Sequence, residues 1–215
     1  MKKKKPVRRG EAKDRLLVAA RDKIIAHGVD GVSLRAINSA AGVSPGILHY
    51  HFGSLDNLVL TLLGRFMAPL MKEREDLLSI LKASDQAPTA QQIAEILVLP
   101  LARLALDQGD EGFSHVCLLA RLSADRSPLL GEASARWASD FNAALFEQLM
   151  RANPDFDSAE LALRQDLAGQ VMLRGLSALR QPPPSWLAQR GMASVEPWEQ
   201  VRIVIKFVAA GLWAA

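Results

Sequence analysis

The chain has 215 residues, enough for one small module and one larger helical domain, and its formal net charge is only +3. The apolar run at residues 203–215 contains Lys206 and is shorter than the ~20 residues that a membrane-spanning helix needs, which argues against a membrane partner. Cys117 is the only cysteine, so no internal disulfide is possible and a reducing cytoplasm is the expected location.

The charge is distributed unevenly along the chain. Residues 1–55 hold 11 Lys and Arg against 4 Asp and Glu, whereas residues 56–215 hold 15 against 19. Clustered cations favour a phosphate backbone, because a DNA duplex carries about one charge per 1.7 Å and its neutralisation releases counterions. The asymmetry therefore favours nucleic acid over a membrane surface as the partner.

Residues 1–10 are predicted to form a basic flexible arm, too charged and too short to fold alone. Two interpretations of this arm stay open. It is either a solvated tail, or a segment that lies along phosphates or enters the minor groove, in which case Lys4 and Lys5 contact DNA.

The rest of the chain is predicted to be all-α, because strand alternation is nearly absent and the segments between Pro, Gly and Asp are rich in helix-forming residues. We expect a small three-helix unit at residues 11–55 and a larger helical domain at residues 56–215. Prolines at 69 and 100 should kink the helices that contain them. The predicted helices cover residues 11–27, 33–41, 45–52, 54–81, 89–107, 113–124, 129–152, 158–180 and 196–213.

The segment 33–58 reads as two short helices separated by a tight turn. Ser33 can cap the first helix, and Gly42 can end it in a left-handed backbone conformation. Ser44 is expected to cap the second helix, with Pro45 at its first position, where the missing amide is harmless. Along that helix Leu48 faces inward, and the outer residues can meet DNA.

The motif Gly42-Val43-Ser44-x-Gly46-x-Leu48-x-x-His51-Phe52, followed by Ser54 and Leu58, resembles the signature of the TetR family of transcriptional regulators. The resemblance by motif covers residues 12–60, and the remaining chain is similar only in its all-helical layout. It implies a helix–turn–helix DNA-binding domain at residues 11–55 and an effector-binding and dimerisation domain at residues 56–215. It also implies a ligand-responsive regulator, more readily a repressor than an activator.

The resemblance and the outward positions together assign the DNA contacts. Arg35 would reach a guanine or clamp a phosphate, and the two capping serines would donate to phosphates. Tyr50 and His51 match the family's aromatic residue and its phosphate-binding histidine, although Tyr50 could simply pack. The candidate DNA contacts are Ser33, Arg35, Ser44, Pro45, Gly46, Ile47, His49, Tyr50 and His51, with Lys4 and Lys5 of the arm.

Three residues depart from the family pattern. His49 replaces a tyrosine that contacts the DNA backbone, Leu55 replaces a lysine that contacts phosphate, and Asn38 replaces an alanine and must satisfy its amide. The alternative function is therefore a helical interaction protein that has lost DNA binding. An enzyme is less favoured, since no catalytic constellation, cofactor motif or metal site is apparent: His49 and His51 are two apart and face different sides of a helix.

The resemblance also implies a homodimer formed by the helices at 158–180 and 196–213, which would place two recognition helices on an inverted repeat. Both helices are rich in small and apolar residues, which could equally serve the protomer's own core. The candidate interface residues are Leu161, Ala168, Val171, Gly175, Val204, Val208 and Trp213.

An effector pocket is implied by the resemblance alone. Because few cations lie among the apolar faces, we expect a hydrophobic or acyl-type small molecule, although core packing explains each candidate as well. The candidate pocket residues are Met67, Met71, Phe113, Leu118, Leu122, Trp137, Phe141, Phe146 and Met172.

Overall fold

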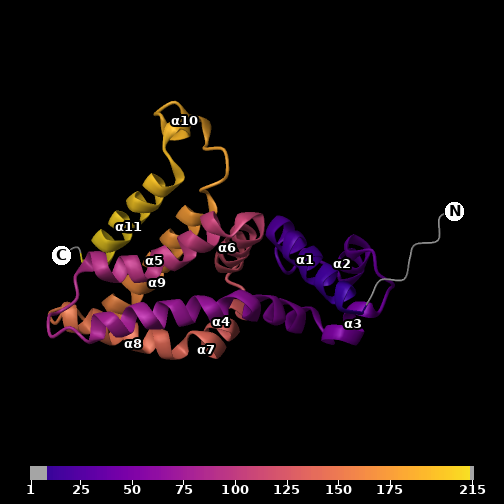
Figure 1. Ribbon diagram of the computed structural model, residues 1–215, viewed down its shortest axis with the longest axis horizontal. Helices are drawn as coiled ribbons and strands as arrows, with labels where there is room; N and C mark the ends of the chain where they lie inside the picture. Colours follow the sequence, from indigo (N-terminus) through magenta and orange to yellow (C-terminus); the bar gives the residue numbers. More distant parts are fainter. Residues whose placement is uncertain (1–8, 214–215) are drawn as a thin grey trace.

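The computed structural model describes residues 9–213 and contains helices and no strand within that range. Figure 1 shows a small head at one end and a longer helical body, and α4 (Leu55–Lys82) runs between them. The head consists of α1 (Arg9–His27), α2 (Leu34–Ala41) and α3 (Ile47–Phe52). The body continues from α4 with α5 (Ala90–Asp107), α6 (Gly109–Ala124), α7 (Pro128–Trp137), α8 (Ser139–Ala152), α9 (Ser158–Ser177), α10 (Ser185–Ala188), the 3₁₀ helix η1 (Met192–Ser194) and α11 (Pro197–Trp213). The all-α prediction is confirmed.

The head has its own apolar interior. Leu16, Ala20 and Ile24 recur every four residues along α1 and are buried together with Ile37 of α2 and Leu48 of α3. The predicted arm at residues 1–10, including Lys4 and Lys5, lies almost wholly outside the described residues.

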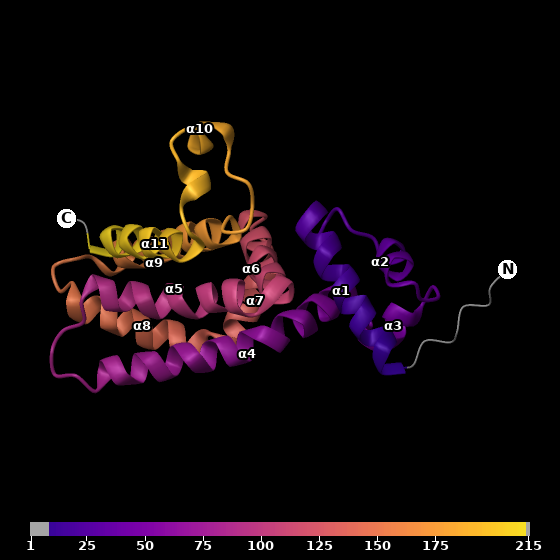
Figure 2. The ribbon, with the colours of Figure 1, turned by 45° about the horizontal axis from the view of Figure 1, so that its top comes forward.

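Helix α4 belongs to both parts of the molecule. It has 28 residues, which corresponds to about 42 Å of helix. Ser54 caps it, because its Oγ accepts a hydrogen bond from the amide of Asn57 at 3.1 Å. Leu58 near its start is buried with the head, and Leu78 near its end is buried in the body. Figure 2 shows the helix leaving the body and reaching the head.

Helix α5 lies in the middle of the body, packed against α4, α6, α9 and α11. Ile93, Val98 and Leu101 are buried on it, and Pro100 is buried inside it. Thr89 and Gln92 form a capping box at its start, which fixes where the helix begins. None of the helices in residues 9–213 combines the length and apolarity needed to cross a membrane.

The prediction of a single helix at residues 129–152 is wrong, because the chain forms two helices there. Helix α7 ends at Trp137 and α8 begins at Ser139, with Ala138 at φ −124° and ψ 2° between them. Ala138 is buried, and Asn142 Nδ2 donates across the break to Ser134 Oγ at 3.1 Å. Packing of both helices against α4 sets this break, which no Gly or Pro marks in the sequence.

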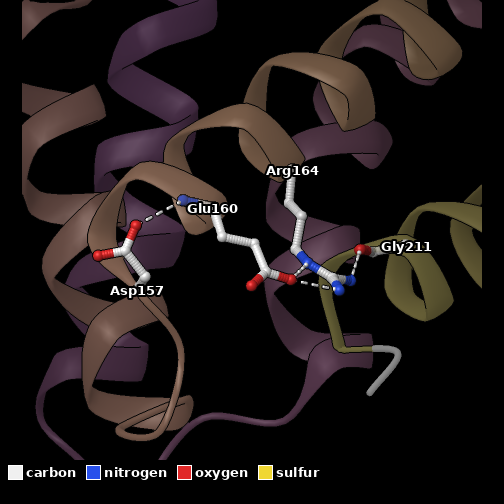
Figure 3. Close-up of polar contacts among 4 residues, drawn as sticks. All are labelled: Asp157, Glu160, Arg164 and Gly211. Carbon is white, nitrogen blue, oxygen red and sulfur yellow. Dashed lines mark hydrogen bonds and ion pairs between the residues drawn. The ribbon is translucent and has the colours of Figure 1, made fainter.

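A polar contact links α9 to α11 (Figure 3). Asp157 caps α9 by accepting hydrogen bonds from the amides of Ala159 and Glu160. Arg164 pairs with Glu160 at 2.7 Å and donates to the carbonyl of Gly211 at 2.9 Å. The start of α9 is therefore tied to the end of α11, so the two helices run antiparallel.

Candidate nucleic-acid interface

Helix α2 begins and ends where the sequence predicts. Ser33 Oγ accepts a hydrogen bond from the amide of Ala36 at 3.1 Å, and Gly42 ends the helix in the left-handed region at φ 66°. The amide of Val43 then donates to the carbonyl of Asn38 at 3.0 Å, which satisfies a carbonyl at the helix end. The Ser33 cap and the Gly42 turn are both confirmed.

The start of α3 corrects the prediction. The helix begins at Ile47, two residues later than expected, and Ser44 makes no capping hydrogen bond. Instead the amide of Ile47 donates to the carbonyl of Ser44 at 3.3 Å, with Gly46 at φ 91° and ψ −17°. These values fit a type II turn, which favours Pro at its second position and Gly at its third. The pair Pro45-Gly46 thus makes a turn before the helix, not its first turn.

Asn38 links the two helices of the motif. It is 6% exposed. Its Nδ2 donates to the carbonyl of Leu34 at 2.9 Å, and its Oδ1 accepts from the amide of Leu48 at 3.3 Å. The Leu48 amide lies in the first turn of α3, where amides lack a partner within the helix. Asn38 therefore supplies from α2 the cap that α3 lacks locally, and the departure from the family pattern stabilises the motif.

Most of the predicted contact residues lie at the surface of the head. Ile47 and His51 are half-buried, whereas the other seven described candidates are exposed, and Leu48 and Phe52 are buried behind them. A groove between α2 and α3 is lined by Arg35, Pro45, Gly46 and His49 among others. The ring of Tyr50, which is 65% exposed, meets that of His51 edge-on at 5.2 Å.

This surface is electrostatically suited to an anionic partner. No acidic residue occurs between Asp30 and Asp56, so α2, α3 and their turn contain none. Arg35 is exposed, and no carboxylate of residues 9–213 lies within ion-pair distance of it. Phosphate oxygens would therefore meet cations and amides without a competing carboxylate.

A short helix held by a tight turn on an acid-free surface, carried on a separate helical body, defines a helix–turn–helix DNA-binding protein. Two family models match the chain. The model of the bacterial regulatory proteins of the tetR family covers residues 16–62, and that of the tetracyclin repressor-like C-terminal domain covers residues 95–211. The chain belongs to the TetR family, and it is a DNA-binding transcriptional regulator.

Solved structures share this fold at low sequence identity. A putative TetR-family regulator from Rhodococcus sp. is 16% identical and aligns with a TM-score of 0.57, over 94% of this chain and 100% of that one. Another from Syntrophomonas wolfei is 13% identical with a TM-score of 0.57, over 96% and 97%. The fatty acid degradation regulator FadR from Bacillus halodurans is 15% identical with a TM-score of 0.55, over 98% of each chain. A comparison with curated proteins finds no match.

The predicted effector residues lie inside the body and are packed there. Leu118 and Leu122 are fully buried, and Met67, Met71, Phe141 and Met172 are nearly so. Phe113, Trp137 and Phe146 are half-buried. A pocket among these residues stays a prediction.

Arg74 on α4 is a buried cation that the sequence reasoning missed. Its guanidinium lies 5.6 Å from the ring centre of Phe141 and donates to the carbonyl of Leu97 at 2.5 Å, while Nε has no partner. Burial lowers the pKa of Arg74 to about 10. The sequence spacing could have predicted this burial. Arg74 lies four residues from Leu70 and four from Leu78, which are both buried, so it falls on the inward stripe of α4.

Most of the predicted interface residues pack within the protomer. Leu161, Ala168 and Val208 are buried within the protomer, and their contact with a second chain stays a prediction. Gly175 lies against Val204, where an added Cβ would come within 2.7 Å of a Val204 methyl, so this pair joins α9 to α11 of the same chain. Trp213 is half-buried against the core, and Val171 at 36% is the most exposed of the set.

Proposed function

We propose that the protein is a cytoplasmic repressor that binds an inverted-repeat operator as a homodimer and is released by a small effector. The observation that carries this proposal is an exposed apolar face on α9 and α11, the last two long helices. Its members are Leu163, Leu167 and Val171 on α9 and Ile203 and Phe207 on α11.

This apolar face is more than scattered surface hydrophobicity. The three α9 residues are spaced by four, as are the two α11 residues, so each set forms one stripe along its helix. Leu163 is 59% exposed, Ile203 53% and Phe207 64%. Contiguous apolar patches on soluble protomers commonly mark contact surfaces, and burial of such area gains about 25 cal/mol per Å². A two-fold partner would cover this apolar face with an identical one.

A dimer formed in this way determines how DNA is read. A two-fold axis through the apolar face would present two copies of α3 on one side of the assembly. Helix–turn–helix dimers place their recognition helices about 34–36 Å apart, one turn of B-DNA. The operator would then be an inverted repeat, with Arg35 of each protomer available to a base or a phosphate.

The effector is proposed to be hydrophobic or acyl-type. The interior of the body consists mainly of aliphatic and aromatic side chains. The similar structure from Bacillus halodurans is described as a fatty acid degradation regulator, which places acyl compounds among the first to test. A ligand that binds the body would change DNA affinity only through its differential affinity for two arrangements of the head, typically 1–3 kcal/mol.

Selection of genomic fragments with the purified protein at two salt concentrations, followed by footprinting, tests the proposal. We expect a protected inverted repeat whose affinity falls steeply with salt, because several phosphates are neutralised. Absence of enrichment at low salt would contradict DNA binding by this chain and favour the helical interaction protein.

A further inference from the structure

A cavity of about 270 Å³ lies at the junction of the head and the body. It is lined by four helices: α1 contributes Leu17 and Arg21, α4 contributes Phe66, α5 contributes Leu104 and α6 contributes His115. Its volume is just below the usual range of sites for drug-sized ligands, so an occupant would be a smaller molecule. None of the nine candidate pocket residues named from the sequence lines it.

Two arginines line this junction cavity. The side chain of Arg21 is only 11% exposed, and its ion-pair partner Asp22 points to solvent with 58% exposed and does not line the cavity. Arg65 also lines the cavity, and its partner Asp14 likewise does not. Both arginines thus have their carboxylate partners outside the cavity.

His115 is the buried polar group of the junction cavity. It is 8% exposed and stacks on the ring of Phe66, with ring centres 4.4 Å apart and planes at 17°. No hydrogen bond to its ring nitrogens forms within residues 9–213. Burial lowers the pKa of His115, and Arg21 and Arg65 act in the same direction, against Glu111. A bound anion near the ring would raise the pKa of His115 again.

Two acidic residues, Glu73 and Glu111, also line the cavity, and Glu111 offsets part of the effect of the arginines on His115. Glu73 forms an ion pair with Arg103, and Glu111 is exposed. Apart from Gln108, the remaining lining residues are apolar, and they include Pro69 and Pro100. The lining thus offers an occupant both cations and apolar groups.

We propose that the junction cavity binds a small amphipathic carboxylate, with its carboxylate at Arg21 and His115 and its apolar body against Phe66 and Leu104. Binding itself does not depend on the proposed repressor function, but its regulatory consequence does. Because the ligand touches α1 of the head and three helices of the body, it would bias the angle between them. Pro69 in α4 and Pro100 in α5 each remove a backbone hydrogen bond next to the cavity, which makes both helices easier to bend there.

Calorimetric titration of the full chain with phenylacetate, benzoate and hexanoate tests the site, with phenylacetamide as the neutral match. At least one carboxylate should bind with a dissociation constant of about 1 mM or tighter, and phenylacetamide about tenfold or more weakly. Arg21→Gln should weaken carboxylate binding by about tenfold or more, because a charge-assisted hydrogen bond is lost. Arg15→Gln, on the same helix in an exposed pair with Glu11, is the control and should leave binding unchanged.

A proton resonance titration of His115 supplies a readout that loss of packing would not produce. Saturation with the carboxylate should raise the pKa of His115 in the unaltered chain. Addition of phenylacetamide should leave this pKa unchanged. His115→Gln identifies the resonance. Failure of all three carboxylates to bind, or equal weakening by Arg21→Gln and Arg15→Gln, would overturn the proposal.

The same ligand added to the complex with the selected operator separates the two proposals. If the carboxylate releases DNA from the unaltered protein but not from Arg21→Gln, the result supports both the site and its regulatory role. If no operator is found, the repressor proposal fails while the binding experiment still decides the cavity.

Discussion

Several residues of the head satisfy backbone polar groups at helix ends. The roles of Ser33 and Gly42 could be predicted, because each acts on backbone within a few residues of itself. The role of Asn38 could not, since its partner is the amide of Leu48, ten residues away. That amide is available only because α3 begins at Ile47, which depends on the turn before it.

Asn38→Ala should destabilise the head. The substitution leaves the buried amide of Leu48 without a partner, which costs about 1–3 kcal/mol of unfolding free energy. It should also weaken operator binding, because α3 loses its link to α2. Urea denaturation measures the first effect, and Ser39→Ala at the adjacent exposed position is the control. Equal stability of the two variants would contradict the bridging role.

The free energy of unfolding should fall as the pH drops below about 6.5, the ordinary pKa of histidine. The fall should continue until the pH has passed the lowered pKa of His115 in the folded chain. Burial disfavours the charged ring, Arg21 and Arg65 repel it, and Glu111 partly compensates. The unfolded chain therefore takes up this proton at a higher pH than the folded chain, so acidification favours unfolding.

Thermal melts between about pH 7.5 and 5.5 should show this slope, with a shallower slope in His115→Gln. His49→Gln, at an exposed position, serves as the comparison. An identical slope in His115→Gln and in the unaltered chain would contradict the assignment.

At the scale of elements, most helices could be located from apolar spacing and caps, and each error has a physical cause. The late start of α3 follows from Pro45-Gly46, a pair that fits a type II turn as well as a helix start. The break at Ala138 follows from packing against α4, and a run of helix-forming residues gives no sign of it. Predictions from local pattern fail where the deciding contact is distant in sequence.

Gly46→Ala tests the turn before α3. The residue has φ 91°, and an added Cβ would meet no atom within 4 Å, so the cost is conformational alone. We expect a loss of about 1–2 kcal/mol in unfolding free energy. Gly131→Ala is the matched control, because Gly131 lies inside α7 with open space around it and has no positive φ. That control should gain up to about 1 kcal/mol. Equal effects would contradict the turn.

At the scale of the whole molecule, the sequence identifies α9 and α11 as apolar helices but not which of their sides is free. Leu161 and Leu163 are only two residues apart, yet the first is buried and the second is 59% exposed. Contact with α5 and between the two helices decides this difference. For the same reason the junction cavity could not be predicted, because its lining comes from four helices.

Phe207→Glu should convert the proposed dimer to monomer. A carboxylate at the centre of an apolar contact would remain desolvated and unpaired, at a cost of several kcal/mol. Sedimentation velocity measures the state of assembly, and operator affinity should fall with it. Ile80→Glu is the control, because Ile80 is 71% exposed on α4, outside the apolar face. A dimer that survives Phe207→Glu would place the interface elsewhere.

Because α4 is part of both the head and the body, the two parts should unfold cooperatively. Its first turns complete the interior of the head, and its later turns complete that of the body, within one continuous buried cluster from Leu16 to Leu212. Neither part can lose α4 and keep its own interior, so we expect a single unfolding transition. Amide hydrogen exchange in α1 should then slow when a ligand stabilises the body, although α1 lies at the opposite end of the molecule from most of it.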